Sequence, residues 1–289
     1  MYNAYWNLRE QPFQNVADPR FAYLSDQHHE GLARLIYLAS NHKLGGALTG
    51  QFGVGKSMVL ELLAQKIREE NRSRYLSVEI LPGETLGLAR QLLAFIGQSQ
   101  PIADMTAVIE IVRGICHDPK AAFQHTVLAV DEAHLINDHT TFEFLHMLTN
   151  LSVTGRDLTP QYSAFTLILA GHMSVLGHIR AYASLCQRLQ LVWNLEPLTE
   201  VQTLEYLQHR IRTAGGDIWI FENDAIPALH QAAQGLPRLI NNICDVALML
   251  GCAGQTRKIT KALIEQAASE ALGPLGSAPA PKGEAPERG

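Results

Sequence analysis

The stretch ALTGQFGVGKSMVLELLAQ, residues 47–65, decides how the rest of the chain is interpreted. A glycine-rich segment, a lysine and a serine lie between a short apolar run and a run with helical periodicity. Residues 50–57 match the pattern G-x-x-x-x-G-K-[ST] in full, and a strand before it and a helix after it are the context that this pattern requires. The pattern predicts a loop that holds the phosphates of a nucleoside triphosphate; the alternative is a chance glycine turn.

The residue types in this turn suit phosphate binding. Glycines allow the backbone to curl until successive N–H groups point at phosphate oxygens, and the helix that begins near Lys56 adds the positive end of its dipole. We expect Lys56 to reach the β- and γ-phosphates and to take part in catalysis, and the Ser57 hydroxyl to hold Mg²⁺. The residues expected to contact the nucleotide are Gly50, Gln51, Phe52, Gly53, Val54, Gly55, Lys56, Ser57 and Met58.

A pair of acids follows a later buried run, in the segment VLAVDEAH. In an open α/β sheet, ligands bind outside the carboxyl ends of the strands, so Asp131 is expected beside the magnesium ion. Glu132 is expected to polarise the water that attacks the γ-phosphate, in a reaction where positioning and electrostatics carry the step. The presence of both acids favours hydrolysis over simple nucleotide binding; the alternative is a solvated pair of acids in a turn.

Three further residues are candidates for completing the site, and each has a plain surface role as its alternative. His172 follows the strand LILAG and is the candidate phosphate sensor. Arg188, with Arg180 as its competitor, precedes the fifth expected strand and is the candidate finger for a neighbouring subunit's γ-phosphate. Arg238 follows Pro237 in the first turn of a helix, where it is expected to serve a ligand in the cleft between domains.

Strands alternate with helices in the first two thirds of the chain, and only helices follow Pro197. Apolar strands that alternate with helices predict a parallel sheet covered on both faces. Strands are expected at 45–50, 75–81, 126–134, 164–171 and 188–198, and helices at 56–70, 85–96, 106–116, 141–151, 223–234, 237–250 and 260–271. Thr199 and Gln202 have the spacing of a capping box at the start of the helical part.

The domain boundaries follow from this change of pattern. We expect an α/β nucleotide-binding domain at residues 1–198, with an irregular aromatic segment at 1–26, and a helical lid domain at 199–272. Residues 273–289 are rich in Pro, Gly and Ala without an apolar anchor, so they are expected to be disordered.

Composition limits the partners and the compartment. Hydrophobic residues make up 47% and charged residues 18%, as in globular proteins. A net charge of −5 gives no strong field for nucleic acid or anionic membrane. No apolar run approaches the roughly 18 residues that a membrane span needs, and the four cysteines form no C-x-x-C pair. His28 and His29 are adjacent, but no metal-ligand spacing accompanies them. A cytoplasmic protein is expected.

These motifs together resemble an AAA+ ATPase, and more narrowly the ATPase domain of GspA/ExeA-type general secretion pathway proteins. That family has F-G-L-x-x-x-P-F and D-P-R-F-x-Y-L-S segments, then a helix with H-x-E-A-L-A-R-L. The matching segments here are Trp6-Asn7-Leu8, Pro12-Phe13, Asp18-Pro19-Arg20-Phe21, Tyr23-Leu24-Ser25 and the run from His29 to Leu35. The resemblance covers about residues 1–271, and the GLPR segment at 235–238 also matches it.

The resemblance implies a P-loop NTPase fold of the AAA+ type, with ATP and Mg²⁺ bound. It also implies self-association into a ring or dimer, and a role for Arg20, Phe21 and Tyr23 in closing the nucleotide pocket. The family's G-Q-P-E-L after strand four is replaced here by GHMSV, which changes the sensor position. The longer secretion proteins continue into a membrane span and a periplasmic domain, so this chain is expected to be either a stand-alone relative or a shortened one.

Three functions remain open at the level of sequence. The first and favoured one is an ATPase that supports assembly of a secretion or pilus-type envelope machine through a protein partner. The second is an ATP-dependent DNA-binding regulator of transposition, which the negative net charge disfavours because counterion release from basic surfaces drives DNA binding. The third is a switch that binds nucleotide without turnover.

Overall fold

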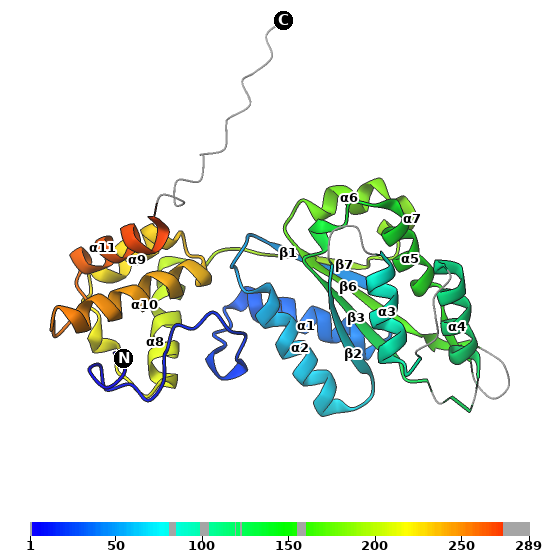
Figure 1. Cartoon of the computed structure of the whole chain (residues 1–289), viewed down its shortest axis with the longest axis horizontal. Coiled ribbons are helices and arrows are strands. Elements are labelled where there is room, and N and C mark those ends of the chain that lie inside the picture. The colour runs from blue at the N-terminus through cyan, green and yellow to red at the C-terminus, as the bar shows by residue number, and fades with distance from the viewer. Residues whose placement is uncertain are drawn as a thin grey trace, which may run out of the picture. The chain divides into compact units, whose positions relative to one another are not determined.

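The computed structural model describes residues 2–80, 85–98, 104–118, 120–121, 123–154 and 160–273. The chain divides into two compact units. The α/β unit comprises Ala17–Pro197, and the helical unit comprises the described residues up to Val16 and from Leu198 onward (Figure 1). Residues 274–289, which make up nearly all of the expected disordered tail, lie outside the described part of the chain.

A five-stranded parallel sheet forms the centre of the α/β unit (Figure 1). Its strands are β1 (Gly45–Gly50), β2 (Arg74–Glu79), β3 (Thr126–Asp131), β6 (Phe165–Gly171) and β7 (Leu191–Leu195). They are arranged in the order β2-β3-β6-β1-β7, and every neighbouring pair is parallel. The predicted parallel sheet is therefore confirmed, and β6 separates the glycine turn after β1 from the acids after β3.

Helices cover both faces of this sheet. Helices α1 (Asp26–Ser40) and α2 (Lys56–Glu70) pack together on one face, and α3 (Thr85–Phe95), α4 (Met105–His117) and α5 (His139–Thr149) lie on the other (Figure 1). Successive strand residues point to opposite faces. Leu128 and Val130 of β3 accordingly join the core formed with α3, α4 and α5, while Val127 and Ala129 are buried on the side of α1 and α2. Burial on both faces explains why the strands are almost wholly apolar.

Four short elements of the α/β unit were not expected from the sequence. Strands β4 (Ser152–Thr154) and β5 (Pro160–Ser163) form an antiparallel pair in the segment that the sequence analysis left as a loop. Helices α6 (Val175–Ala181) and α7 (Ala183–Cys186) follow β6 and lie near α5. Elements of three to seven residues contain only one or two repeats of the helical or strand period, so hydrophobic periodicity gives little signal for them.

The helical unit contains α8 (Glu200–Thr213), α9 (Ala225–Ala233), α10 (Pro237–Ala253) and α11 (Lys261–Leu272), with a short 3₁₀ turn at Ile218–Ile220. The predicted capping box is present at the start of α8: the hydroxyl of Thr199 accepts from the N–H of Gln202, and the side chain of Gln202 accepts from the N–H of Thr199. Of the helices that the structure describes, none has the length and apolar character needed to cross a bilayer.

The N-terminal segment, residues 2–16, packs within the helical unit, whereas the sequence analysis assigned it to the α/β domain. The indole Nε1 of Trp6 donates to the carbonyl of Leu248 at 2.8 Å. The buried Arg210, 3% exposed, donates from Nε to the Pro12 carbonyl at 2.6 Å and from Nη2 to the Gln14 carbonyl at 2.8 Å. These bonds join positions 196 to 242 residues apart in sequence, so local patterns give no indication of them.

Candidate functional site

The glycine turn connects β1 to α2 and has a backbone that only glycine adopts easily. Gly50 and Gly55 have φ values of +156° and +112°. A Cβ atom on Gly50 would lie 2.7 Å from the Leu195 carbonyl oxygen, and one on Gly55 would lie 2.9 Å from Nε2 of His28. Gly55 is the N-cap of α2, so the turn opens directly onto the free N–H groups of that helix, where anions bind.

Lys56 directs its ammonium group into the turn. The residue is buried, and Nζ donates to the carbonyl oxygens of Gly50 at 3.0 Å and Gln51 at 2.9 Å. Nζ also lies 5.9 Å from the ring centroid of the exposed Phe52, at the outer limit for a cation–π contact. The only positive charge in the turn is thus held by main-chain oxygens next to the N–H groups that would face an anion.

Ser57 and Asp131 meet at the carboxyl edge of the sheet. The Ser57 hydroxyl donates to Oδ2 of Asp131 at 2.9 Å, and Oδ1 of Asp131 accepts from the N–H of Glu132 at 2.8 Å. A hydroxyl and a carboxylate are oxygen ligands of the kind that Mg²⁺ takes together with substrate phosphates. The donor set therefore fits the predicted magnesium ion, because both predicted ligands lie side by side beside the glycine turn.

Glu132 lies in the turn that follows β3 with a left-handed backbone, at φ +51° and ψ 32°. Such a backbone is uncommon for a residue other than glycine, and outliers of this kind concentrate at functional sites. Its side chain is 41% exposed, and Oε2 lies 3.2 Å from Nδ1 of His134. Glu132 is thus accessible to water and close to Asp131, as a residue that acts on a water molecule must be.

His172 lies at the end of β6, between the glycine turn and the acids. Its ring stacks on Phe52 with centroids 5.1 Å apart and planes 7° apart, and the edge of His134 meets the same Phe52 ring at 5.3 Å. Nδ1 of His172 accepts from the N–H of Ser174 at 3.3 Å. The structure therefore brings together the loops that follow β1, β3 and β6, with one aromatic ring from each: Phe52, His134 and His172.

Comparisons with known proteins find relatives of this chain in sequence and in fold. Residues 39–177 match the family model described as an AAA domain. This part of the chain is similar to AAA domains. Over 281 residues it is 31% identical to general secretion pathway protein A of Aeromonas hydrophila, and the match covers 94% of this chain. The chain spans about half of that relative, 49% of its length.

Two solved structures are similar to this chain in fold. The structure of Drosophila ORC bound to DNA matches 93% of this chain and 66% of its own chain, with a TM-score of 0.69 and 15% identity. The Aeropyrum pernix ORC2 protein in its ADPNP-ADP complexes matches 87% and 71%, with a TM-score of 0.64 and 11% identity. At these identities the likeness concerns the fold alone.

His28 supports the glycine turn, and the sequence analysis missed this role. Nδ1 of His28 lies 2.7 Å from the Ser25 hydroxyl, and Nε2 lies 3.0 Å from the Val54 carbonyl. Because a carbonyl only accepts, Nε2 carries the proton and Nδ1 accepts from Ser25. Burial lowers the pKa of His28 below its ordinary value, which favours this neutral form.

A signal for His28 was present in the sequence. The buried positions of α1 are His28, Gly31, Leu35, Leu38 and Ala39, so the histidine continues the buried stripe of the helix at helical spacing. Leu32 and Ile36 of the same helix are also apolar but only half-buried. A histidine in register with buried apolar positions needs hydrogen-bond partners, and here one of them is the glycine turn.

Four of the predicted arginine and tyrosine candidates occupy different parts of the chain. Arg20 lies in a 3₁₀ turn, Pro19–Phe21, that contacts α2, and its Nη2 pairs with Asp18 at 2.6 Å. Tyr23 is half-buried in the segment before α1. Arg188 follows α7, and its charge lowers the pKa of His146 together with the larger effect of burial. Arg238 lies in the first turn of α10 in the helical unit.

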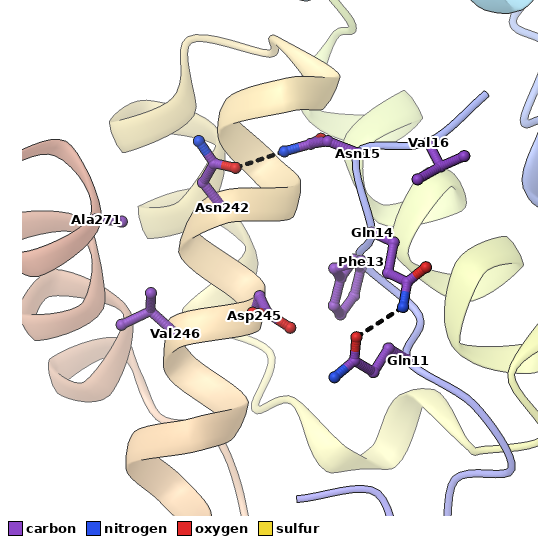
Figure 2. A pocket seen from close by; sticks show the side chains of 9 residues that line it. All are labelled: Gln11, Phe13, Gln14, Asn15, Val16, Asn242, Asp245, Val246 and Ala271. Atoms are coloured by element: carbon purple, nitrogen blue, oxygen red, sulfur yellow. Dashed lines mark hydrogen bonds between the residues drawn. The ribbon is translucent and has the colours of Figure 1, made fainter. Parts of the chain in front are cut away.

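The helical unit has a pocket of about 530 Å³, lined by the N-terminal segment, α10 and α11 (Figure 2). Figure 2 shows two carboxamide pairs at its rim, Asn15 with Asn242 and Gln14 with Gln11, whose hydrogen bonds measure 2.6 and 2.7 Å. The carboxylate of Asp245 also lines it and accepts from the hydroxyl of Tyr2. None of the residues predicted to hold the nucleotide lines this pocket.

Proposed function

We propose that this protein binds ATP with Mg²⁺ and hydrolyses it to ADP and phosphate. The observation that carries the proposal is the bond of 2.9 Å between the Ser57 hydroxyl and the Asp131 carboxylate, with Glu132 next in the chain. Three groups with separate tasks in phosphoryl transfer thus converge beside a turn whose backbone suits phosphate.

Each residue has a defined task in this proposal. The N–H groups of the turn and of the first turn of α2 bind phosphate oxygens, and Lys56 exchanges its carbonyl partners for the β- and γ-phosphates. Ser57 and Asp131 hold Mg²⁺, which when bound neutralises charge on the phosphate oxygens. Glu132 accepts a proton from the water whose oxygen attacks the γ-phosphorus, and the bond to ADP breaks as the new bond forms.

The remaining candidates complete the site in the same proposal. His172 senses the γ-phosphate from the end of β6, and Arg188 of one subunit reaches the nucleotide of its neighbour in a ring or dimer. Arg238 contacts the bound nucleotide, and Arg20, Phe21 and Tyr23 close its pocket. An arginine supplied by a neighbour is worth about 10³–10⁵ in rate, so hydrolysis is expected to increase with protein concentration.

We further propose that the ATPase acts in the cytoplasm to support assembly of a secretion-type envelope machine with a protein partner. The support is the 31% identity over 94% of this chain to general secretion pathway protein A. In the source organism, loss of the gene is then expected to impair general secretion. The wild-type gene restores it, and a gene encoding Lys56→Ala does not.

The enzymatic part is tested by comparing ATP binding and hydrolysis in two variants. Glu132→Gln is expected to bind ATP normally and to lose about 10²–10⁴ in kcat, the usual contribution of a general base. Lys56→Ala is expected to lose ATP affinity. Glu143→Gln, on α5 with a side chain that is 46% exposed, is the matched control and keeps both properties. A Glu132→Gln protein with wild-type kcat would overturn the proposed role of Glu132.

The same preparations test the alternative function. Binding of duplex DNA is measured with and without ATP at several salt concentrations. Weak, ATP-independent binding is expected at a net charge of −5. Tight binding that requires ATP and falls steeply with salt would favour a regulator of transposition instead.

A further inference from the structure

The imidazole of His134 lies against the carboxylate of Glu132 in the turn after β3. Nδ1 of His134 is 3.2 Å from Oε2 of Glu132, and the two side chains are 14% and 41% exposed. We propose that His134 is a positioning residue that orients the Glu132 carboxylate for hydrolysis. The inference rests on the proposed function, in which Glu132 accepts the proton of the attacking water.

The two polar contacts of Nδ1 bear on which ring nitrogen of His134 carries the proton. Nδ1 of His134 lies near two groups, Oε2 of Glu132 at 3.2 Å and the backbone nitrogen of His172 at 3.4 Å. A carboxylate only accepts and a backbone N–H only donates, so one ring nitrogen satisfies one of them at a time. The shorter contact is the one to the carboxylate, and we therefore assign a proton to Nδ1. Oε2 of Glu132 is then engaged, and Oε1 is left for water.

The ring of His134 is itself held in place. It forms T-shaped contacts with the rings of Phe52 and His172, with ring centroids 5.3 and 6.2 Å apart. At the end of β6, a Cβ atom on Gly171 would lie 3.0 Å from the backbone nitrogen of His134 and 3.2 Å from its Nδ1. Glycine at 171 therefore lets the acidic turn approach the strand, and the imidazole has little room to rotate.

A fixed partner matters because Glu132 is otherwise mobile. A glutamate side chain that is 41% exposed samples several rotamers, and only a fraction of them aim an oxygen at the attacking water. Displacing a catalytic group by about 1 Å costs as much as 10²-fold in rate. The contact with His134 selects one orientation of the Glu132 carboxylate, which changes the rate of the chemical step without adding a contact to the nucleotide.

The test compares three histidine variants in steady-state ATPase assays with the full chain. His134→Phe keeps a flat ring against Phe52 but removes Nδ1–H, and kcat is expected to fall by about 10- to 100-fold with KM for ATP within about threefold. His134→Asn places an amide nitrogen near the position of Nδ1 and is expected to recover kcat to within about fivefold of wild type.

His139→Phe is the matched control. Nδ1 of His139 lies 3.4 Å from Oε1 of Glu143 on α5, so the same type of pair is removed outside the site. Its kcat and KM are expected to equal those of the wild type. Gly171→Ala gives an independent route, since the added methyl presses on His134, and it is expected to lower kcat without raising KM.

The outcomes separate this inference from the proposed function. Wild-type kcat in His134→Phe overturns the inference, and so does a low kcat that His134→Asn leaves unrecovered, because ring packing would then be the cause. If His134→Phe fails to fold, wild-type kcat in Gly171→Ala overturns it instead. Wild-type kcat in Glu132→Gln would remove the catalytic base itself and with it the proposed mechanism.

Discussion

The glycine turn of the α/β unit and the N-terminal segment of the helical unit are both irregular, but they are held by different means. The turn is fixed by its own backbone, with φ values that suit glycine, and by the cap of the helix that follows it directly. The N-terminal segment is fixed by side chains from distant helices, above all by Arg210, which lies 196 and 198 positions from its two carbonyl partners. The shape of a locally fixed segment depends mainly on its own residues, whereas a segment fixed from a distance depends on the rest of its unit.

The largest effect is expected from removing Arg210, which tests whether distant side chains hold the N-terminal segment. Arg210→Met replaces the arginine with an unbranched apolar side chain. The Pro12 and Gln14 carbonyls then lose their charged donor. Hydrogen bonds to charged groups contribute about 1.5–3 kcal/mol each, so we expect a loss of about 3 kcal/mol or more in the free energy of unfolding. Hydrogen exchange is expected to rise in residues 2–16, while ATP affinity stays within about threefold.

Arg212→Met is the control for that experiment, because Arg212 is exposed on the same helix. Surface substitutions of this kind usually change stability by less than about 0.5 kcal/mol. If both variants show the same exchange in residues 2–16, the N-terminal segment is held by something other than Arg210.

Acid is expected to destabilise the α/β unit through His125, which is 1% exposed. Its Nδ1 bonds the Ser163 carbonyl at 2.8 Å and its Nε2 bonds the Thr166 hydroxyl at 3.0 Å. Burial lowers the pKa of His125 to about 4, against a smaller opposing effect of the Ser163 carbonyl and with a small contribution from His42. An unfolded chain takes up this proton near pH 6.5, so the unfolded state binds more protons between those values.

Stability is therefore lost as the pH falls from about 6.5 to about 4, by about 2–3 kcal/mol from this residue. Urea unfolding at pH 7 and pH 4.5 measures the loss, and His125→Gln is expected to show a smaller difference between the two. His139→Gln, at an exposed position, is the control and should keep the wild-type difference. An unchanged pH dependence in His125→Gln would contradict the assignment.

The sequence predicted those features that depend on neighbouring residues. The turn at 50–57, the five strands of the sheet, the exact bounds of α2 and the capping box at Thr199 all follow from patterns within about fifteen residues. The contact of His28 with the glycine turn did not follow, because its partner, the Val54 carbonyl, lies 26 positions away in another loop. The packing of the N-terminal segment in the helical unit was not predicted, because its hydrogen-bond partners are likewise distant in sequence. The β4–β5 pair was missed because its strands are too short for a periodic signal.

His28 tests whether the glycine turn is as self-sufficient as the comparison implies. His28→Ala leaves the Val54 carbonyl without its buried donor, which costs about 1–1.5 kcal/mol and is expected to raise the Kd for ATP by about 5- to 10-fold. His29→Ala, an exposed neighbour on the same helix, should leave the Kd unchanged. Equal Kd values for both variants, measured by calorimetric titration, would mean that the turn needs no support from α1.

The smallest effect is expected from one substitution placed at two contrasting glycines of the α/β unit. Gly177 lies within α6, and a Cβ atom there would meet nothing within 4 Å, so Gly177→Ala is expected to raise the free energy of unfolding by about 0.5–1 kcal/mol. Gly55→Ala adds the same methyl where φ is +112° and Nε2 of His28 lies 2.9 Å away, so it should weaken ATP binding. Because the added group is identical, a loss of ATP affinity in Gly55→Ala that Gly177→Ala does not show is due to the backbone shape and the close packing of the turn. If Gly55→Ala binds ATP as well as Gly177→Ala does, the turn tolerates a different backbone and its local rigidity is not what binds phosphate.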